Sequence, residues 1–348
     1  MNTKILIRCD VGYEVGYGHI VRCLALAAVL KAEYDCEVTF AMLSSTDSVA
    51  KIQKEGHRVI QKDSDKDSMD EAWWLERIAL DLQPRALILD VRTGLKGKDL
   101  LSIRERGVVV VSIDDPSDRK FFSDLFFAPP VPQLKNMDRN LFSGDCYIGW
   151  EWVLLRPQFA MTKRRQVLKS AKIDGRSEQT LLISMGGSDP KGLTLTALEA
   201  VERLGIELRT IVVLGGGFMH HEKLKSFLKM TEKNYQIQSE VNDIAQLMAA
   251  ADIAVASFGV TAYELAAVGT PALYLCLSPD DQQSAFALEI AGFGKIVGLA
   301  DSVSRIHLSK IIEERLISTS KYDLQHKLLM DGLGATRIAS KIMSKIER

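Results

Sequence analysis

The stretch KILIRCDVGYEVGYGHIVRCLALAAVLK, residues 4–31, carries the pattern that decides the fold. Its first six residues, Lys4–Cys9, predict a buried strand, and Ile20–Lys31 predicts a helix. Glycines separate the two elements. A strand that passes through a glycine-rich loop into a helix is the opening unit of an α/β domain built on a parallel sheet.

The first half of the chain continues this alternation of strands and helices. Further apolar runs predict strands at Glu37–Met42, Ala86–Asp90 and Val108–Asp114. Helices are predicted over Val49–Glu55 and Ala72–Leu82. Runs as apolar as these are typical of strands buried on both faces, as in parallel sheets covered by helices.

The second half restarts the pattern after a region rich in proline and basic residues, between Pro129 and Arg176. This basic stretch is either a surface for acidic groups or, more simply, a solvated helix and linker. Further strands are predicted at Thr180–Met185, Arg209–Leu214, Asp252–Ser257 and Ala272–Cys276. Further helices are predicted at Thr194–Leu204, Asn242–Ala250, Thr261–Val268, Val303–Ile317 and Lys321–Lys345. The order predicts two Rossmann-like domains with mostly parallel sheets that face each other across a cleft, covering residues 1–158 and 177–348 and joined by a linker at 159–176.

Composition limits the classes of function. The chain has 348 residues, of which 47% are hydrophobic, with 44 basic and 45 acidic side chains and a formal net charge of -1. Such a balance argues against a nucleic-acid partner bound through phosphate neutralisation. The first residues lack signal-peptide architecture, and no apolar run is long enough for a transmembrane segment. We therefore expect a cytoplasmic protein.

The first glycine loop contains Gly16, Gly18 and the histidine His19. A dinucleotide fingerprint would require glycine where the chain has Val21, and no P-loop motif is present, so the sequence argues against binding of NAD or of a P-loop nucleotide here. The positive end of the following helix disfavours an extra proton on His19, which would keep the imidazole neutral and able to accept one. His19 is thus a candidate general base or a simple helix-capping group. Asp10 and Arg22 are candidates to orient it, to bind substrate or to form a structural ion pair.

Two loops of the second half suggest a site for phosphates. Gly186, Gly187 and Ser188 precede a predicted helix, and clustered backbone N–H groups at such a place suit an anion. The second loop, Gly259–Val260–Thr261, also opens a helix, on which Glu264 could accept hydrogen bonds from a ribose. The alternative interpretations are an ordinary strand-to-helix turn and a capping carboxylate.

A fourth loop places Asp281 and Gln282 after the strand Ala272–Cys276. These side chains are suited to holding sugar hydroxyls. A capped helix start explains the same residues, and adjacent acids alone are poor grounds for a metal.

Taken in order, GYGHIVRCLALA (residues 16–27), LLISMGGSDP (181–190), the helix with Thr261 and Glu264, and the Asp-Gln pair resemble the nucleotide-sugar hydrolases of pseudaminic acid biosynthesis. That family hydrolyses UDP-2,4-diacetamido-2,4,6-trideoxy-β-L-altropyranose, includes spore-coat polysaccharide relatives, and is similar in fold to MurG-type GT-B glycosyltransferases. The closing DGLGATRIA (331–339) also resembles the family's C-terminus.

The resemblance implies a role for each matched residue. His19 corresponds to the general base, Gly186, Gly187 and Ser188 to the phosphate-side loop, Gly259 and Thr261 to the diphosphate-binding helix start, and Glu264 to the carboxylate on the uridine ribose. The chain departs from the family at Val91-Arg92-Thr93, where an aromatic-bearing motif is common, and at Asp281, where Asn is typical. Both loops should touch the sugar, so these departures leave its identity open.

The sequence therefore predicts a hydrolase that cleaves a nucleotide-activated sugar at the anomeric carbon. His19 would activate water, and Gly259, Thr261 and the helix behind them would stabilise the leaving diphosphate. Asp10, Gly16, Gly18, Arg22, Asp281 and Gln282 are the expected substrate-binding residues. Glycosyl transfer with an acceptor hydroxyl in place of water is the alternative, and non-catalytic binding of a nucleotide sugar is a third. We expect the protein to use no cofactor and no metal and to bind no nucleic acid.

Overall fold

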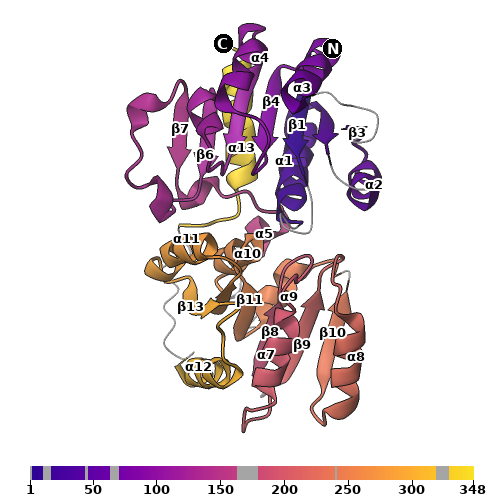
Figure 1. The fold of residues 1–348 in the computed structure, drawn as a ribbon, viewed down its shortest axis with the longest axis vertical. Coiled ribbons are helices and arrows are strands. Elements are labelled where there is room, and N and C mark those ends of the chain that lie inside the picture. Colours follow the sequence, from indigo (N-terminus) through magenta and orange to yellow (C-terminus); the bar gives the residue numbers. More distant parts are fainter. Residues whose placement is uncertain are drawn as a thin grey trace. The chain divides into compact units, whose positions relative to one another are not determined.

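The computed structural model describes residues 2–10, 17–43, 46–62, 70–162, 179–239, 241–318 and 329–348. The chain divides into two compact units. The first contains residues 1–130, 136–156 and 333–348, and the second contains residues 131–135 and 157–332. Each unit is an α/β structure built on one parallel sheet, as Figure 1 shows. The predicted pair of Rossmann-like domains with parallel sheets is confirmed.

The first unit contains a seven-stranded parallel sheet in the order β3-β2-β1-β4-β5-β6-β7. Its strands are β1 (Lys4–Cys9), β2 (Glu37–Met42), β3 (Arg58–Gln61), β4 (Ala86–Asp90), β5 (Val109–Ile113), β6 (Leu125–Ala128) and β7 (Asp145–Ile148). Strand β1 lies between β2 and β4, with Arg8 aligned to Leu89 and Cys9 to Asp90. The carboxyl ends of β1 and β4 therefore lie side by side.

Helices cover both faces of this first sheet. They are α1 (Gly18–Tyr34), α2 (Thr46–Lys54), α3 (Glu71–Leu82), α4 (Leu101–Glu105) and α13 (Gly334–Ile346). Because side chains alternate along a strand, Ile7 packs in the core under α1 and α13, whereas Leu6 packs in the core under α3. Strand β1 is buried on both faces, which explains its nearly continuous apolar sequence.

The second unit contains a six-stranded parallel sheet in the order β10-β9-β8-β11-β12-β13. Its strands are β8 (Thr180–Ser184), β9 (Arg209–Leu214), β10 (Tyr235–Ser239), β11 (Ile253–Ser257), β12 (Ala272–Cys276) and β13 (Gly294–Leu299). Its helices are α5 (Gln158–Met161), α7 (Leu193–Val201), α8 (His221–Met230), α9 (Ile244–Ala250), α10 (Val260–Val268), α11 (Pro279–Ile290) and α12 (Arg305–Ser318). The four central strands β8, β9, β11 and β12 are the four that the sequence predicts.

The C-terminal helix belongs to the first unit, and this corrects the expected assignment of residues 177–348 to the second domain. Helix α13, yellow in Figure 1, packs against α1, and its Ala335, Ile338 and Ile342 join the core beneath that helix. Gly334 permits this, because a Cβ there would clash with the carbonyl of Val153. The amphipathic last helix therefore buries its apolar face on the first sheet.

The boundary between the two units also differs from the predicted linker at 159–176. The first unit extends to Arg156, and Phe159 already lies buried in the second unit as part of α5. Residues 163–178, which contain most of the predicted linker and its basic stretch, lie outside the described residues. Residues 319–328, at the start of the predicted last helix, do so as well.

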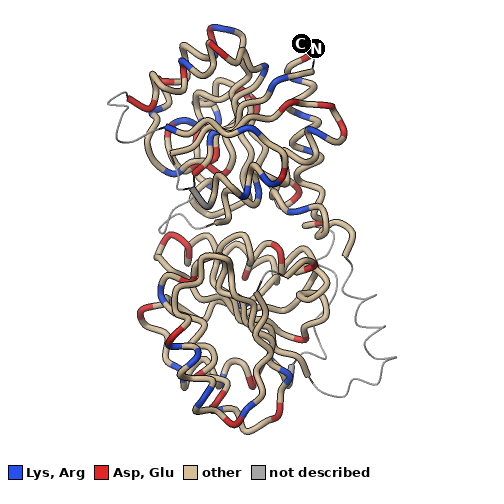
Figure 2. Tube along the Cα trace, turned by 90° about the vertical axis from the view of Figure 1, so that its right-hand side faces the viewer, with Lys and Arg blue, Asp and Glu red and all other residues tan. Residues whose placement is uncertain are grey.

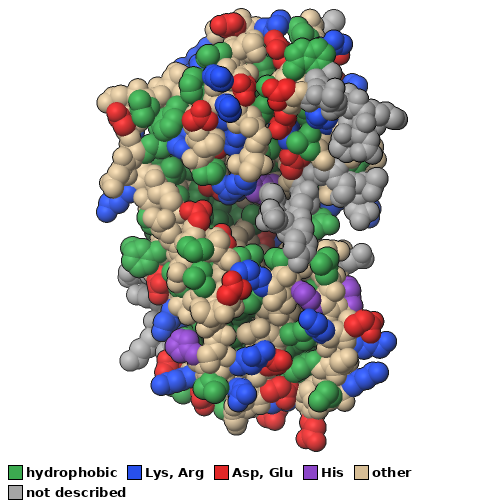
Figure 3. Space-filling view, viewed as in Figure 1, with side chains coloured by type: hydrophobic (Ala, Val, Ile, Leu, Met, Phe, Trp, Pro, Cys, Tyr) green, Lys and Arg blue, Asp and Glu red, His purple; other side chains and the backbone are tan. Residues whose placement is uncertain are grey.

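Charges are distributed over both units without segregation by sign. Figure 2 shows acidic and basic residues interspersed along the trace of each unit, and the face drawn in Figure 3 carries the same mixture. Such a surface agrees with the near-zero formal charge of -1. In the part of the chain that the structure describes, no helix is long and apolar enough to cross a membrane.

Candidate functional site

The strand order of the first sheet indicates the edge at which a ligand is expected to bind. After β1 the chain moves outward through β2 and β3 and then returns to the other side of β1 as β4. In open α/β sheets ligands bind beyond the carboxyl ends of the strands at such a reversal, where the loops diverge. The loop after β1 leads to His19 on α1, and β4 ends at Asp90.

His19 and Asp90 form a buried hydrogen-bonded pair at this edge. The Nδ1 atom of His19 lies 2.6 Å from Oδ1 of Asp90, and the two residues are 7% and 1% exposed. Asp90 is ionised and can only accept, so Nδ1 of His19 carries the proton and donates. In the neutral ring the lone pair then belongs to Nε2. The pair therefore orients His19 with a proton-accepting nitrogen on the far side of the ring.

Arg22, one turn further along α1, holds the same carboxylate. Its Nε lies 2.6 Å from Oδ2 of Asp90 and its Nη2 lies 2.5 Å from Oδ1. Burial by itself would raise the pKa of Asp90, but the charges and hydrogen bonds of Arg22 and His19 hold that pKa well below its usual range. Nη2 of Arg22 is also 3.3 Å from Nδ1 of His19; this contact is not a second hydrogen bond, since Nδ1 already donates to Asp90.

Asp114 extends the cluster to the next strand. It follows β5, and its Oδ2 accepts from Nη1 of Arg22 at 3.0 Å and from Nη2 of Arg92 at 3.0 Å. Arg92 stands in the loop after β4 where the resemblance leads one to expect an aromatic motif, while the preceding Val91 is buried in the core. Helix α1 and the ends of the neighbouring strands β4 and β5 thus contribute charged groups to one edge.

The sequence analysis missed Asp90 and Asp114 as members of the site. A signal was present, because each ends a run that is otherwise almost wholly apolar, ALILD and VVVVSID. A carboxylate at the carboxyl end of a buried parallel strand lies where ligands bind. Arg22 was predicted, and its contacts with Asp90 match the ion pair that was one of its alternatives, while orientation of His19 and substrate binding by Arg22 stay predictions.

Asp10, Gly16 and Gly18 are placed less directly. Asp10 accepts from the buried Arg8 at 2.6 Å and from the backbone N–H of Leu43 at 2.8 Å, which matches the structural ion pair left open by the sequence. Gly18 is the first residue of α1, so this helix begins two residues before its predicted start. Gly16 lies outside the described residues. Substrate binding by these three stays a prediction.

The second sheet reverses its strand order between β8 and β11, and glycine-rich loops follow both strands. After β8, Gly186 adopts a φ of 73°, and a Cβ on Gly215 would clash with the carbonyls of Gly186 and Gly187. Two backbone segments therefore pack directly on each other. Ser188 is buried next to this turn, and Asp189 caps α7 by accepting from the N–H groups of Leu193 and Thr194.

The loop after β11 leads into α10 through Gly259. Gly259 has a φ of 151°, which disfavours any residue with a side chain, and a Cβ there would meet open space. Val260 and Thr261 form the first turn of α10, where backbone N–H groups have no partner within the helix. These features suit an anion at the helix start. Glu264 is only 4% exposed, so its predicted contact with a ribose is not evident at the surface and stays a prediction.

Asp281 acts as a helix-capping residue. Its N–H donates to Oγ of Ser278 at 3.1 Å, and its Oδ2 accepts from the N–H of Ser278 at 3.1 Å, which is a reciprocal capping box at the start of α11. Burial raises the pKa of Asp281, and Asp280 beside it acts in the same direction. This is the alternative that the sequence allowed. Gln282 follows in the first turn, and the sugar contacts proposed for both residues remain predictions.

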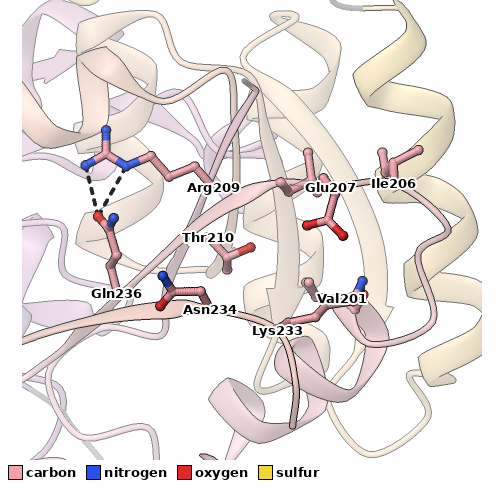
Figure 4. Close-up of a pocket in the computed structure, with 9 residues that line it drawn as sticks. Val201, Ile206, Glu207, Arg209, Thr210, Lys233, Asn234 and Gln236 are labelled. Carbon is pink, nitrogen blue, oxygen red and sulfur yellow. Dashed lines mark hydrogen bonds between the residues drawn. The ribbon is translucent and has the colours of Figure 1, made fainter. Parts of the chain in front are cut away.

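A cavity of about 250 Å³ occurs elsewhere in the second unit, and Figure 4 shows its lining. It lies where β9 and β10 begin, at the opposite edge of the sheet from the glycine loops. Arg209 bonds Gln236 at 2.9 Å, and Nζ of Lys233 caps the end of α7 through the carbonyls of Val201 and Leu204. Three of its polar side chains, Arg209, Gln236 and Lys233, are thus engaged in holding the unit together. Among the described residues, no group of His, Cys, Asp or Glu side chains has the arrangement of a metal site.

Comparison with solved structures identifies the fold. MurG of Acinetobacter baumannii aligns with a TM-score of 0.71 and 17% identity over 98% of this chain and 99% of that one. The chain has the GT-B fold. Another solved GT-B neighbour, HepE of Anabaena in complex with UDP-glucose, aligns with a TM-score of 0.57 and 14% identity, covering 99% of this chain and 98% of that one.

No family model matches the chain, and the sequence relatives described here share less than 30% identity with it. The spore coat polysaccharide biosynthesis protein SpsG of Bacillus subtilis is 26% identical over 358 aligned positions, which cover 98% of each chain. An uncharacterized protein of Methanocaldococcus jannaschii is 28% identical over 280 positions and 78% of this chain. The chain spans 55% of the length of that relative. The chain therefore combines the GT-B fold with homology to SpsG over 98% of its length.

Proposed function

We propose that the chain is an enzyme of glycan biosynthesis that transfers a sugar from a nucleotide carrier to the hydroxyl of an acceptor. The GT-B fold shared with MurG, the homology to a spore coat polysaccharide protein and the neighbour that holds UDP-glucose support this assignment. Fold alone does not specify function, so the proposal depends on the residues at the carboxyl ends of the strands in each sheet. The observation that carries it is the His19–Asp90 pair at the carboxyl edge of the first sheet.

The second unit would hold the nucleotide. Backbone N–H groups of Gly186, Gly187 and Ser188, and those of Gly259, Val260 and Thr261, would donate to the diphosphate. Gly186 and Gly259 adopt positive φ values, which leave the main chain unshielded where a phosphate approaches. Glu264, in the second turn of α10, would accept from the ribose hydroxyls as the sequence resemblance implies.

The first unit would supply the base. Nε2 of His19 takes the proton from the acceptor hydroxyl while the acceptor oxygen bonds to the anomeric carbon and the bond from that carbon to the diphosphate breaks. Asp90 is ionised beside Nδ1 and stabilises the imidazolium that forms. The positive end of α10 stabilises the negative charge on the departing nucleotide.

Hydrolysis, the reaction that the sequence predicts first, remains the second candidate. The hydrogen bond from His19 to Asp90 places the lone pair of the neutral ring on Nε2, which can accept from water as well as from an acceptor hydroxyl, so this contact is compatible with both reactions. The neighbours by fold support transfer at least as well. The two reactions share the nucleotide, the base and the bond that breaks, and differ in the group that attacks.

Product analysis separates the candidates. The purified full chain is incubated with a panel of UDP-sugars, with and without a mixture of sugar acceptors, and UDP and sugar products are measured by mass spectrometry. Transfer gives UDP and an extended sugar that depend on the acceptor. Release of UDP and free sugar without acceptor identifies a hydrolase, and tight UDP binding with no release under either condition identifies a non-catalytic binding protein.

A further inference from the structure

Arg92 is held firmly at the ligand edge of the first sheet. Its Nη1 donates to the backbone carbonyl of Asp114 at 2.7 Å, and its Nη2 donates to Oδ2 of Asp114 at 3.0 Å. Two bonds to one residue determine the plane of the guanidinium as well as its position. About 39% of the Arg92 side chain nevertheless stays exposed.

The anchor of Arg92 is connected to His19 through side chains alone. Asp114 also accepts from Arg22, and Arg22 in turn holds Asp90, the partner of His19. Arg22 and Asp90 are nearly inaccessible to solvent, so this connection is rigid. The position of Arg92 relative to His19 is therefore set by the same network that orients the imidazole.

Arg92 keeps donors available after it has bound Asp114. A guanidinium has five N–H groups, and its hydrogen bonds to described residues use two of them. The surface pair of Arg106 in the same unit is different: Arg106, directly after α4, makes a single side-chain contact, with Glu76 of α3 at 2.9 Å, away from this edge. Arg92 combines a firm anchor with an accessible donor face.

We propose that Arg92 binds an anionic group, a carboxylate or a phosphate, on the sugar substrate that reacts at His19. This inference rests on the proposed function and adds a substrate class to it. Planar N–H pairs of arginine match the two oxygens of a carboxylate or phosphate, whereas lysine offers only a point charge. The anionic group belongs either to the transferred sugar, as in a uronic acid, or to the acceptor, as in a sugar phosphate.

The donor arm of the test compares the binding of UDP-glucuronate and UDP-glucose by calorimetry. Wild-type protein, Arg92→Gln, Arg92→Lys and the matched surface variant Arg106→Gln are measured, with UDP alone as reference. If the anion is on the donor sugar, wild type and Arg106→Gln favour UDP-glucuronate by about tenfold to a hundredfold, as expected for a charge-assisted hydrogen bond. Arg92→Gln loses that preference and keeps its affinity for UDP, and Arg92→Lys retains a small part of it.

The acceptor arm repeats the comparison in the presence of saturating UDP, with glucose 6-phosphate against glucose. Here the same loss of preference in Arg92→Gln assigns the anion to the acceptor. Thermal unfolding of each variant verifies that it is folded. If the wild type binds UDP but binds the charged and the neutral sugar with equal affinity in both arms, the role of Arg92 alone is overturned. A charge preference that survives in Arg92→Gln overturns it as well. Absence of UDP binding by the wild type overturns the proposed function together with this inference.

Discussion

The ligand edges of the two sheets are constructed from different chemical groups. In the first unit, side chains of both signs meet: His19, Arg22, Asp90 and Asp114 come from α1 and from the ends of β4 and β5. In the second unit, the corresponding edge consists of backbone, with Gly186 and Gly187 packed against Gly215 and with Gly259 at the start of α10.

The difference agrees with the separate roles proposed for the two edges. A proton must be taken by a side chain with a defined tautomer, and an ionised partner buried beside it defines that tautomer. Binding of phosphate oxygens requires many N–H groups at close range, which backbone without Cβ atoms supplies best. The comparison predicts that changes in the first edge reduce turnover, while changes in the second reduce nucleotide affinity.

The largest effect is expected for His19→Gln. Removing a general base lowers the rate by about 10² to 10⁴. Because the proposed nucleotide contacts belong to the second unit, UDP affinity should stay within about twofold of wild type. Turnover and UDP titrations check this, with the exposed His307→Gln as control. Equal losses of turnover and UDP affinity would make His19 a binding residue and would remove the contrast between the edges.

Asp90→Asn should reduce both turnover and stability. The variant removes the ion pair of the buried Arg22 with Asp90 and leaves Asp114 as its charged partner, and breaking a buried pair costs about 3–5 kcal/mol of unfolding free energy. Denaturant unfolding of wild type and variant measures the difference. An unchanged unfolding free energy would mean that the ionic cluster contributes nothing to the fold.

The stability difference between wild type and Asp90→Asn should depend on pH in a defined direction. Folding lowers the pKa of Asp90, so its stabilising contribution is fully present above the ordinary aspartate pKa of about 3.9 and declines as pH falls below it. Unfolding curves at a series of pH values from neutral to acid measure this. A difference that grows on acidification would contradict the direction of the shift.

Glu264→Ala examines the second edge through a side chain. Loss of hydrogen bonds from a ribose to a charged group should weaken UDP binding by about 1.5–3 kcal/mol. Turnover at saturating substrate should change less than affinity does. Calorimetric titration with UDP gives the number directly, and a folded Glu264→Ala protein with wild-type affinity would remove the ribose contact from the proposal.

Gly215→Ala examines the same edge through the backbone. The added methyl group would clash with the carbonyls of Gly186 and Gly187, and the displacement should cost about 1–3 kcal/mol in stability. UDP affinity should fall because the phosphate-side loop moves. Gly216→Ala is the matched control, since a Cβ at Gly216 meets no atom within 4 Å. Equal UDP affinity of the two variants would separate this loop from the nucleotide site.

Much of the fold was predictable because the central strands have a distinctive apolar sequence. Strands β1, β4, β8 and β11 are buried on both faces, which demands continuous apolar sequence. The edge strands β3, β7, β10 and β13 went unpredicted for the opposite reason. Strand β10, for example, has the half-buried and mixed sequence YQIQS at the edge of its sheet.

The candidate site was predictable in part. His19 could be proposed because a histidine next to glycines at a helix start is a local feature of the sequence. Its partners are not local: Asp90 lies 71 positions away from His19, and Asp114 lies 92 positions away from Arg22. Asp281 shows the converse, because a helix cap and a sugar ligand use the same residues in the same local pattern.

The sequence by itself determined the local elements: which segments become strands or helices, and where glycine must relieve the backbone. These depend on periodicity and on φ values that are properties of a few neighbouring residues. Tertiary structure alone decided that α13 completes the first unit and that one buried carboxylate joins His19 to Arg22. The physical reason is that strand order, which no local pattern encodes, determines which distant side chains share an edge and which apolar face a last helix can cover.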